Sequence, residues 1–225
     1  MRSTWRTLDR GLRADIALVC LADGIVGVSY GAIAVGLGFA PWLPVLMAGL
    51  VLAGASEFLF VGIVAAGGSP LAALAAGLLV NARHLPFGLA VGDVTGGGWR
   101  RMLGSHVLND ESAVFALGQD DAVRRRAAYW LCGIGILVCW PAGALIGATA
   151  GSVIGDTDVL GLDAMFPTVL LALVIPALRD LATARAALVG AGVALAATPF
   201  LPAGIPVLLA LVGLCAGGVR KVAVR

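Results

Sequence analysis

Two short stretches decide how this chain is interpreted: GASEF at residues 54–58 and VNARHLPFG at residues 80–88. Both lie in strongly apolar surroundings, yet they carry a carboxylate, an amide, a guanidinium and an imidazole: Glu57, Asn81, Arg83 and His84. Ionisable groups are costly in membrane hydrocarbon and are usually kept there for a substrate or ion pathway. We therefore expect a polar site inside an otherwise apolar bundle of helices.

The composition supports a membrane setting. Of the 225 residues, 60% are hydrophobic and only 12% are charged, which is about half the charge of a soluble domain, and the mean hydropathy is +1.00. Because apolar stretches recur along the whole length, the chain is predicted to be an all-α polytopic integral membrane protein. We expect an amphipathic cytoplasmic segment at 1–15, a single transmembrane domain at 16–219 and a basic cytoplasmic tail at 220–225.

The apolar runs predict the individual helices. Seven runs are candidate spans: 16–39, 45–66, 71–91, 127–150, 164–178, 186–200 and 205–219. They predict seven or eight helical segments, some of them short or broken, with both termini cytoplasmic. Arginine-rich loops favour the cytoplasmic side, and on that basis these residues are expected inside: Arg124–Arg126, Arg179 and Arg220. The acidic loop with Asp156 and Asp158 is expected outside.

The region 93–126 is open to two interpretations. Three full crossings from a cytoplasmic N-terminus would put Arg100 and Arg101 outside, against the distribution of positive charge. In one interpretation, residues 106–118 form a short polar crossing. In the other, one early span is broken and re-entrant, and the whole of 93–126 is cytoplasmic, because a broken helix is tolerated where it lines a cavity.

Several binding functions have no support in the sequence. The basic residues form no stripe, so nucleic-acid binding is not expected. The four cysteines each lie in an apolar stretch without CxxC spacing or a nearby ligand cluster, so neither disulfides, nor a metal, nor a cofactor is expected.

The polar motifs predict a substrate site. A zwitterionic amino acid needs a cation for its carboxylate and a carboxylate or carbonyls for its ammonium, and Arg83 and Glu57 supply both signs in adjacent spans. Asn81 and His84, three residues apart, share one helix face. Pro86 is expected to free the carbonyl of Ala82. The candidate substrate-binding residues are Ser56, Glu57, Asn81, Arg83 and His84. The alternative is a structural Glu57–Arg83 ion pair that contacts no substrate.

Proton coupling would need titratable groups in the interior. A histidine whose charge changes near neutral pH suits proton handling, and carboxylates at membrane depth form proton relays. The candidates for proton coupling are Asp23, Glu57, His84, Asp110 and Glu111.

Several motifs resemble the AzlC family, the large subunits of bacterial branched-chain amino acid exporters. The motifs are Gly24-x-x-Gly27-x-x-x-Gly31, AGASEF at 53–58, VNARH at 80–84, Asp110-Glu111-Ser112 and Gly161-Leu162-Asp163. The most distinctive of them is the VNARH block, and the resemblance covers roughly residues 12 to 220.

The resemblance implies a function. It implies export of leucine, isoleucine, valine and related neutral hydrophobic amino acids across the bacterial cytoplasmic membrane, coupled to protons and assisted by a small AzlD-type membrane subunit. The chain departs from the family pattern at Glu57, where glutamine is expected, and at Pro86. A titratable Glu57 would alter the coupling or the substrate.

Three alternatives remain at this stage. The chain would export a different small solute, or act as an intramembrane hydrolase in which Ser56 pairs with His84 or His106, or serve as an assembly subunit without transport. The hydrolase has the least support, because Glu57 follows Ser56 where a nucleophile turn favours a small residue.

Overall fold

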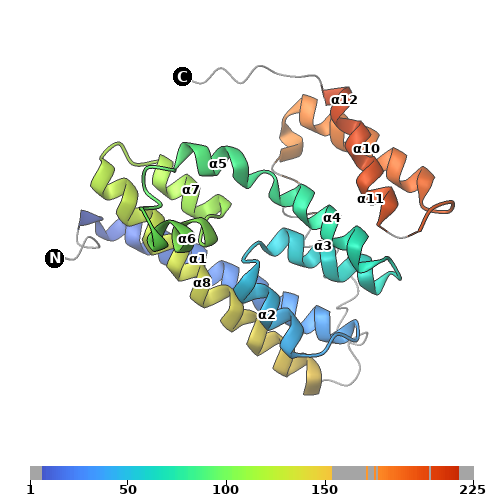
Figure 1. The fold of residues 1–225 in the computed structure, drawn as a ribbon, viewed down its shortest axis with the longest axis horizontal. Coiled ribbons are helices and arrows are strands. Elements are labelled where there is room, and N and C mark those ends of the chain that lie inside the picture. Colours follow the sequence, from blue (N-terminus) through green and yellow to red (C-terminus); the bar gives the residue numbers. More distant parts are fainter. Residues whose placement is uncertain (1–6, 154–170, 172–174, 176, 203, 218–225) are drawn as a thin grey trace. The chain divides into compact units, whose positions relative to one another are not determined.

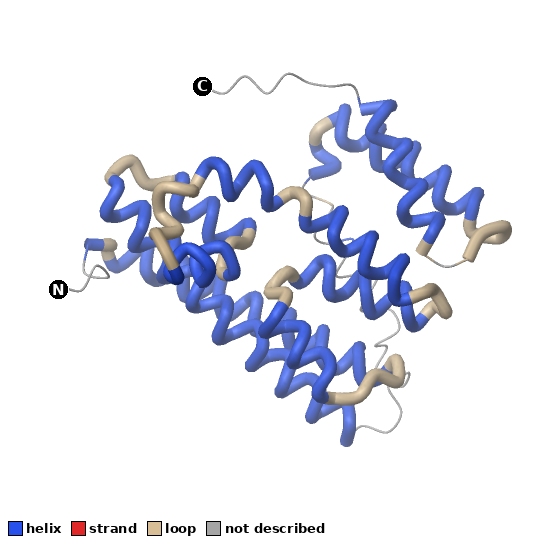
Figure 2. The backbone as a smooth tube through the Cα atoms, viewed as in Figure 1, coloured by secondary structure: helices blue, strands red, loops and turns tan. Residues whose placement is uncertain are grey.

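The computed structural model describes residues 7–153, 171, 175, 177–202 and 204–217. All the regular structure of this described part is helical (Figures 1 and 2). The chain forms two compact units. The first unit contains Met1–Glu57 and Leu79–Asp163, and the second contains Phe58–Leu78 and Ala164–Arg225. The acidic loop around Asp156, Asp163, most of the helix expected at 164–178 and the basic tail lie outside the described residues.

The first unit is built around two long helices, α1 (Arg10–Gly36) and α8 (Ala122–Val153). Both are long and apolar enough to cross a bilayer. They run parallel, because contacts advance along both helices together, from Gly24 beside Cys139 to Gly31 beside Ala148. A methyl group added at Gly27 would lie only 2.7 Å from the carbonyl oxygen of Trp140. Small residues therefore bring the two backbones into direct contact.

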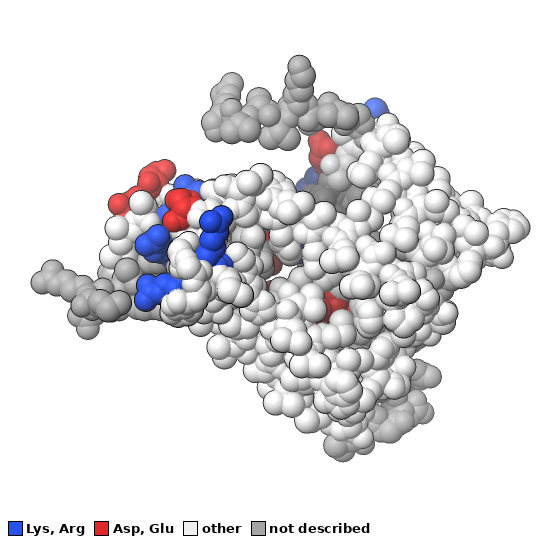
Figure 3. Space-filling model, viewed as in Figure 1, with Lys and Arg blue, Asp and Glu red and all other residues white. Residues whose placement is uncertain are grey.

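The parallel arrangement brings the two helix starts together. Asp9 caps α1 by accepting a hydrogen bond from the Leu12 amide at 2.8 Å. Its other carboxylate oxygen pairs with Arg124 at 2.9 Å, near the start of α8. The Leu12 N–H, followed by Arg124, lowers the pKa of Asp9 below its ordinary value. Figure 3 shows charged side chains gathered over this end of the first unit.

The span expected at 45–66 is broken into two helices. Helix α2 (Trp42–Leu50) ends at a non-helical segment, residues 51–53, and α3 (Gly54–Ala65) follows. Leu52 has φ = 50°, a conformation that is strained for a branched side chain and needs support from its surroundings. Residues 54–56, the Gly-Ala-Ser run of the first motif, begin α3 and are themselves helical.

The span expected at 71–91 is broken in the same way. Helix α4 (Pro70–Asn81) is separated from α5 (His84–Ala90) by a turn at residues 82 and 83. Pro86 has no N–H for the carbonyl of Ala82, but that carbonyl accepts a hydrogen bond from the Leu85 amide at 3.1 Å instead. The expectation of a free acceptor at Ala82 is therefore wrong.

Helices α6 (Trp99–His106) and α7 (Asp110–Leu117), joined by residues 107–109, form a helical hairpin. Helix α7 packs on α8, and α6 meets α8 where the Tyr129 hydroxyl donates to the carbonyl of Gly104 at 2.6 Å. The chain enters it near the start of α8, where the carbonyl of Asp93 accepts from Arg126 at 3.2 Å. The tip at Val107 contacts Gly133, about 16 Å along α8 from its first residue at the helical rise. The hairpin returns to the same end, where Gln119 accepts from Arg124 at 3.3 Å.

This hairpin bears on the two interpretations of residues 93–126. Its two ends lie at the same end of α8, so residues 106–118 do not form the short crossing of the first interpretation. An early span is broken, as the second interpretation requires, but the hairpin penetrates beside α8 rather than lying wholly beyond its end.

The second unit packs short helices against one another. Its described helices are the remainder of α3 and most of α4, with α10 (Leu181–Ala197), α11 (Ile205–Leu209), η4 (Ala210–Val212) and α12 (Gly213–Gly217), preceded by η3 (Ala177–Arg179). Ile63, Ala73 and Ala76 form a buried apolar core. Gly190 and Gly213 let the backbones of α10 and the 210–217 segment approach closely.

The helix boundaries differ from the expected ones in three ways. Helix α1 is continuous across residue 15, where a separate amphipathic segment was expected to end. Two expected spans are each two helices. The described residues hold eleven α-helices, so the expected number of seven or eight segments is not confirmed.

Candidate functional site

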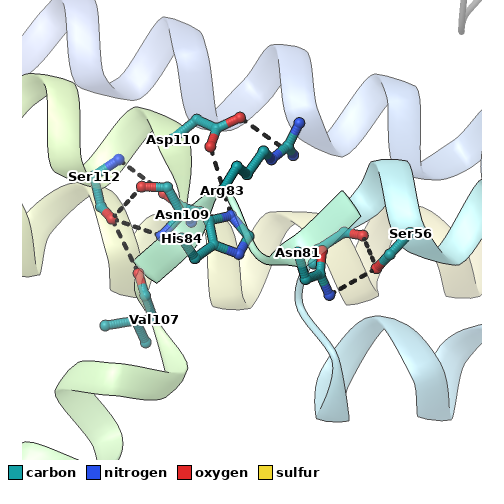
Figure 4. A network of polar contacts seen from close by, with 9 residues as sticks. Ser56, Asn81, Arg83, His84, Val107, Asn109, Asp110 and Ser112 are labelled. Carbon is teal, nitrogen blue, oxygen red and sulfur yellow. Dashed lines mark hydrogen bonds and ion pairs between the residues drawn. The ribbon is translucent and has the colours of Figure 1, made fainter. Parts of the chain in front are cut away.

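The two helix breaks lie next to each other in the first unit. The side-chain amide of Asn81, at the end of α4, donates to the hydroxyl of Ser56 at 3.1 Å. That hydroxyl donates to the carbonyl of Ala53 at 2.8 Å, in the break before α3. Two expected site residues are therefore in direct contact, and together they hold the two breaks side by side (Figure 4).

Ser56 shows no sign of an activated nucleophile. Its hydroxyl hydrogen bonds go to a backbone carbonyl and a side-chain amide, whereas an activated serine donates to a general base. Among the described residues, the imidazole of His84 contacts Asp110, and that of His106 contacts the carbonyl of Gly49 at 2.9 Å. The serine–histidine contact of the hydrolase alternative is therefore not formed.

Glu57 is completely buried at the start of α3. Its Oε1 accepts a hydrogen bond from the amide of Ala53 at 2.9 Å. The indole N–H of Trp140 on α8 lies 3.2 Å from both carboxylate oxygens. Tyr30 of α1 stacks on that indole, with ring centroids 5.6 Å apart. Glu57 thus joins the break to both long helices.

Gly54 is required beside this carboxylate. A methyl group at Gly54 would lie 2.9 Å from the Trp140 ring, so a larger residue would push the indole away from Glu57. This explains the glycine of the GASEF motif by close packing rather than by flexibility.

Arg83 and His84 form a second cluster around Asp110. Arg83 Nη2 lies 3.2 Å from Asp110 Oδ2, and His84 Nε2 lies 3.5 Å from Asp110 Oδ1. The cluster is partly accessible, since 42% of the Arg83 side chain and 36% of the Asp110 side chain are exposed. It therefore combines a cation, an anion and an imidazole at a partly exposed position.

The expected Glu57–Arg83 ion pair is wrong. Among the described residues, the carboxylate partner of Arg83 is Asp110, whereas Glu57 accepts from Ala53 and Trp140. Asp110 was expected only to serve proton coupling. The other two coupling candidates, Asp23 on α1 and Glu111 on α7, are half-buried, and the ion pairs of Arg83 and His84 do not go to them.

The N-terminus of α7 fixes the position of Asp110. Asn109 caps the helix: its Oδ1 accepts from the Ser112 amide at 2.7 Å, while its own amide donates to Ser112 Oγ at 3.0 Å. Ser112 Oγ also donates to the carbonyl of Val107 at 3.1 Å. Asn109 was not among the expected site residues, although Asn-x-x-Ser has the spacing of a capping box. Trp140 was not expected at the site either, and no local signal points to it.

Several polar atoms in this region are buried without a hydrogen-bond partner. Among the described residues these are Asn81 Oδ1 and Asn109 Nδ2, together with His84 Nε2 and Asp110 Oδ1, which meet each other only in the 3.5 Å ion contact. Such atoms are rare in native proteins, and each calls for an explanation. They supply both donors and acceptors, as a zwitterionic ligand would require. A metal fits less well, because no group of three His, Cys, Asp or Glu side chains within the described residues is arranged to hold one.

The comparisons with known proteins agree on one family. The chain is 27% identical over 194 residues to the "Branched-chain amino acid transport protein AzlC" of Bacillus subtilis (strain 168), covering 84% of this chain and 76% of that protein. No solved structure matches the chain significantly. The family model described as "AzlC protein" matches residues 18–154, a range that contains α2 to α7 and all the residues of both clusters. Because this match covers more than half of its length, the chain belongs to the AzlC family.

Proposed function

We propose that the protein is a proton-coupled exporter of branched-chain and other neutral hydrophobic amino acids in the bacterial cytoplasmic membrane. The name of the Bacillus subtilis relative supports the transport of branched-chain amino acids. The observation that carries the proposal is the Arg83–Asp110–His84 cluster, an accessible ion triad beside two helix breaks in an apolar fold. Charged groups beside broken helices are characteristic of transporter binding sites.

The cluster can recognise both ends of a zwitterion. The guanidinium of Arg83 matches a carboxylate in charge and planar geometry. Asp110 can accept from an ammonium group. Asp110 thus takes the role that the sequence analysis gave to Glu57. In the absence of substrate, Arg83 and Asp110 neutralise each other. When a zwitterionic substrate binds, this one internal ion pair would be replaced by two ion pairs, one between Arg83 and the substrate carboxylate and one between Asp110 and the substrate ammonium group.

Proton coupling would use the same cluster. Protonation of His84 places a second positive charge beside Asp110 and so changes the affinity of that carboxylate for an ammonium group. Asp23, Glu57 and Glu111 remain further candidates for carrying the proton. Each lies on a helix of the first unit that contacts α8 or forms the break.

The arrangement of the helices supports a cytoplasmic location for the arginine-rich end of the first unit, where α1 and α8 start. Helices α1 and α8 are parallel and both start at the end with Arg124, Arg125 and Arg126, which the charge rule places in the cytoplasm. Helices α2 and α5 return toward the start of α8: α2 begins at Trp42 beside Leu145 and Ala148 in the second half of α8, and the carbonyl of Ala90, the last residue of α5, accepts from Arg125 near the start of α8. In this topology the α6–α7 hairpin is re-entrant from the cytoplasm.

Labelling of single cysteines in a cysteine-free background tests this orientation. Ala40, after α1, and Asp120, after α7, are both exposed. An impermeant thiol reagent added to intact cells should modify Ala40→Cys and leave Asp120→Cys unmodified until the membrane is opened. The reverse pattern would overturn the orientation.

The partner of the proposed transporter is a small AzlD-type membrane subunit. The family resemblance supports it. So does an apolar groove of about 720 Å³ between α2 and α8, lined by Trp42, Leu46, Leu145 and Ala148 among others, because such a groove can receive the side chains of a partner helix. Co-expression and co-purification test the association, and full transport by the isolated chain would show that the subunit is dispensable.

Counterflow in proteoliposomes tests the function itself. Vesicles loaded with unlabelled leucine should accumulate external radiolabelled leucine, isoleucine and valine, and an imposed pH gradient should drive net movement. Vesicles without the protein are the control. Counterflow of another solute, with none of these amino acids, would contradict the proposed substrate.

A further inference from the structure

Asn109 carries a buried hydrogen-bond donor that the fold does not use. The side chain is 94% buried, with a relative exposure of 6%. Its Oδ1 accepts from the Ser112 amide, and its backbone N–H donates to the Ser112 hydroxyl. Its Nδ2 has no hydrogen-bond partner among the residues that the structure describes. Leaving such a group unpaired away from water is unfavourable.

Helix capping does not explain the choice of asparagine. Aspartate and serine cap helices about as well as asparagine, because the cap requires only a side-chain acceptor. The same chain uses aspartate at two other caps, Asp9 of α1 and Asp180 of α10. The amide of Asn109 thus adds an NH₂ group that α7 does not need.

The unused donor belongs to the polar network of the candidate site. Asn109 directly precedes Asp110, which pairs with Arg83 and His84 (Figure 4). The neighbouring Asp110 supplies acceptor oxygens: its Oδ1 lies 3.5 Å from His84 Nε2, and its Oδ2 lies 3.2 Å from Arg83 Nη2. The network therefore presents a cation and a neutral donor on one hand and acceptors on the other.

We propose that Asn109 is a substrate-binding residue whose Nδ2 donates a hydrogen bond to the substrate carboxylate, alongside the Arg83 guanidinium. This inference rests on the proposed function and names a contact within it. The ligand class is an α-amino acid, with its ammonium group directed to the carboxylate of Asp110. Asparagine suits this position because an aspartate would repel the carboxylate, and a serine would be too short to replace the donor.

The test compares three ligands that share the side chain of leucine and differ in their charged groups. Leucine carries both charged groups, 4-methylpentanoate lacks the ammonium group, and isopentylamine lacks the carboxylate. Binding to the purified full chain, with its partner subunit if that is required, is measured for the wild type, Asn109→Ser and Asn109→Asp. Asp180→Ser, which exchanges the cap of α10 in the second unit, is the matched control. Melting temperatures establish that each variant is folded.

The expected result is selective. Loss of a hydrogen bond to a charged group should weaken the binding of leucine and 4-methylpentanoate by about 10- to 100-fold in Asn109→Ser. Binding of isopentylamine should change by less than about 3-fold, since it cannot use the lost donor. Asn109→Asp should weaken leucine binding further, and Asp180→Ser should bind like the wild type.

Two other outcomes would distinguish failure of the Asn109 contact from failure of the proposed function. If the wild type binds leucine and a folded Asn109→Ser binds it equally well, or loses all three ligands alike, the contact with the carboxylate is refuted while the proposed function stands. If the wild type binds none of the three ligands, the proposed function fails and the contact fails with it.

Discussion

Glu57 is the residue whose surroundings are most completely defined, because two N–H groups converge on its buried carboxylate. In Glu57→Gln, the side-chain carbonyl oxygen can still accept from Ala53 and Trp140. In Glu57→Ala, both donors lose their acceptor. We expect a change below about 1 kcal/mol in the free energy of unfolding for Glu57→Gln, and a loss of about 1–3 kcal/mol per unpaired donor for Glu57→Ala.

Thermal melts in detergent would measure this difference. Trp140→Phe, which removes one donor and retains the carboxylate, is the control and should fall between the two. Equal melting temperatures for Glu57→Gln and Glu57→Ala would show that the hydrogen bonds to Ala53 and Trp140 do not stabilise the break.

At the residue scale, the sequence predicted most of the participants and few of their partners. Apolar surroundings made Ser56, Asn81, Arg83 and His84 conspicuous. Ser56 contacts Asn81, and Arg83 and His84 both contact Asp110. The pairing of Arg83 with Asp110 depends on the α6–α7 hairpin, which returns Asp110 to the start of α5 from 27 residues away. No local pattern encodes that return, so the choice of Glu57 as partner was wrong.

At the scale of the elements, the contact between α1 and α8 depends on glycines. A methyl group at Gly31 would overlap the carbonyl oxygen of Ala144. Because backbone atoms of two packed helices cannot move aside locally, Gly31→Ala should cost about 1–3 kcal/mol, as overpacking does. Gly192→Ala on α10 is the matched control, since its new methyl group would meet open space. A melting temperature lowered equally in both variants would contradict this close packing.

The starts of the same helices are tied by Asp9 and Arg124, which gives the first unit a pH dependence. A lowered pKa means that folding favours the charged form of Asp9. Its contribution is therefore fully present above the ordinary pKa of 3.8 and is lost as the pH falls through the lower folded value. The melting temperature of the wild type should exceed that of Asp9→Asn by a constant amount at neutral pH, and the difference should shrink in acid.

The Arg124→Gln background is the control for this prediction. Without the guanidinium, the effect of Asp9→Asn on the melting temperature should be smaller at every pH, because aspartate and asparagine both cap α1 through a side-chain oxygen. A difference that grows in acid would have the wrong sign and would contradict the pairing.

The elements also show why the helix breaks escaped sequence analysis. The long apolar runs correctly indicated α1 and α8, because length and composition suffice for them. The break at residues 51–53 contains no glycine or proline. It is maintained by Glu57 and by Trp140, 83 positions further along the chain. Local propensity favours a continuous helix there, and tertiary contacts override it.

At the scale of the whole molecule, the parallel pair α1 and α8 and the charged end they share define the proposed membrane orientation. Between them, α2 and α5 return along α8, and the two breaks place Ser56 and Asn81 in contact partway along it. The ion triad then lies where the tip of the α6–α7 hairpin meets α5. Export in this arrangement would begin with the capture of a zwitterion by Arg83, Asp110 and Asn109 on the cytoplasmic side.

The central claim is that Arg83 and Asp110 bind substrate rather than serve as scaffold, and the rate of leucine counterflow in Arg83→Ala/Asp110→Asn tests it most directly. The double variant leaves no unpaired charge, so a scaffold defect of Arg83→Ala would be relieved. As a substrate site, the pair should give rates below about a tenth of wild type in Arg83→Ala, Arg83→Lys and the double variant alike, since lysine lacks the bidentate geometry. Near wild-type counterflow in the double variant, with Arg83→Ala inactive, would contradict the claim.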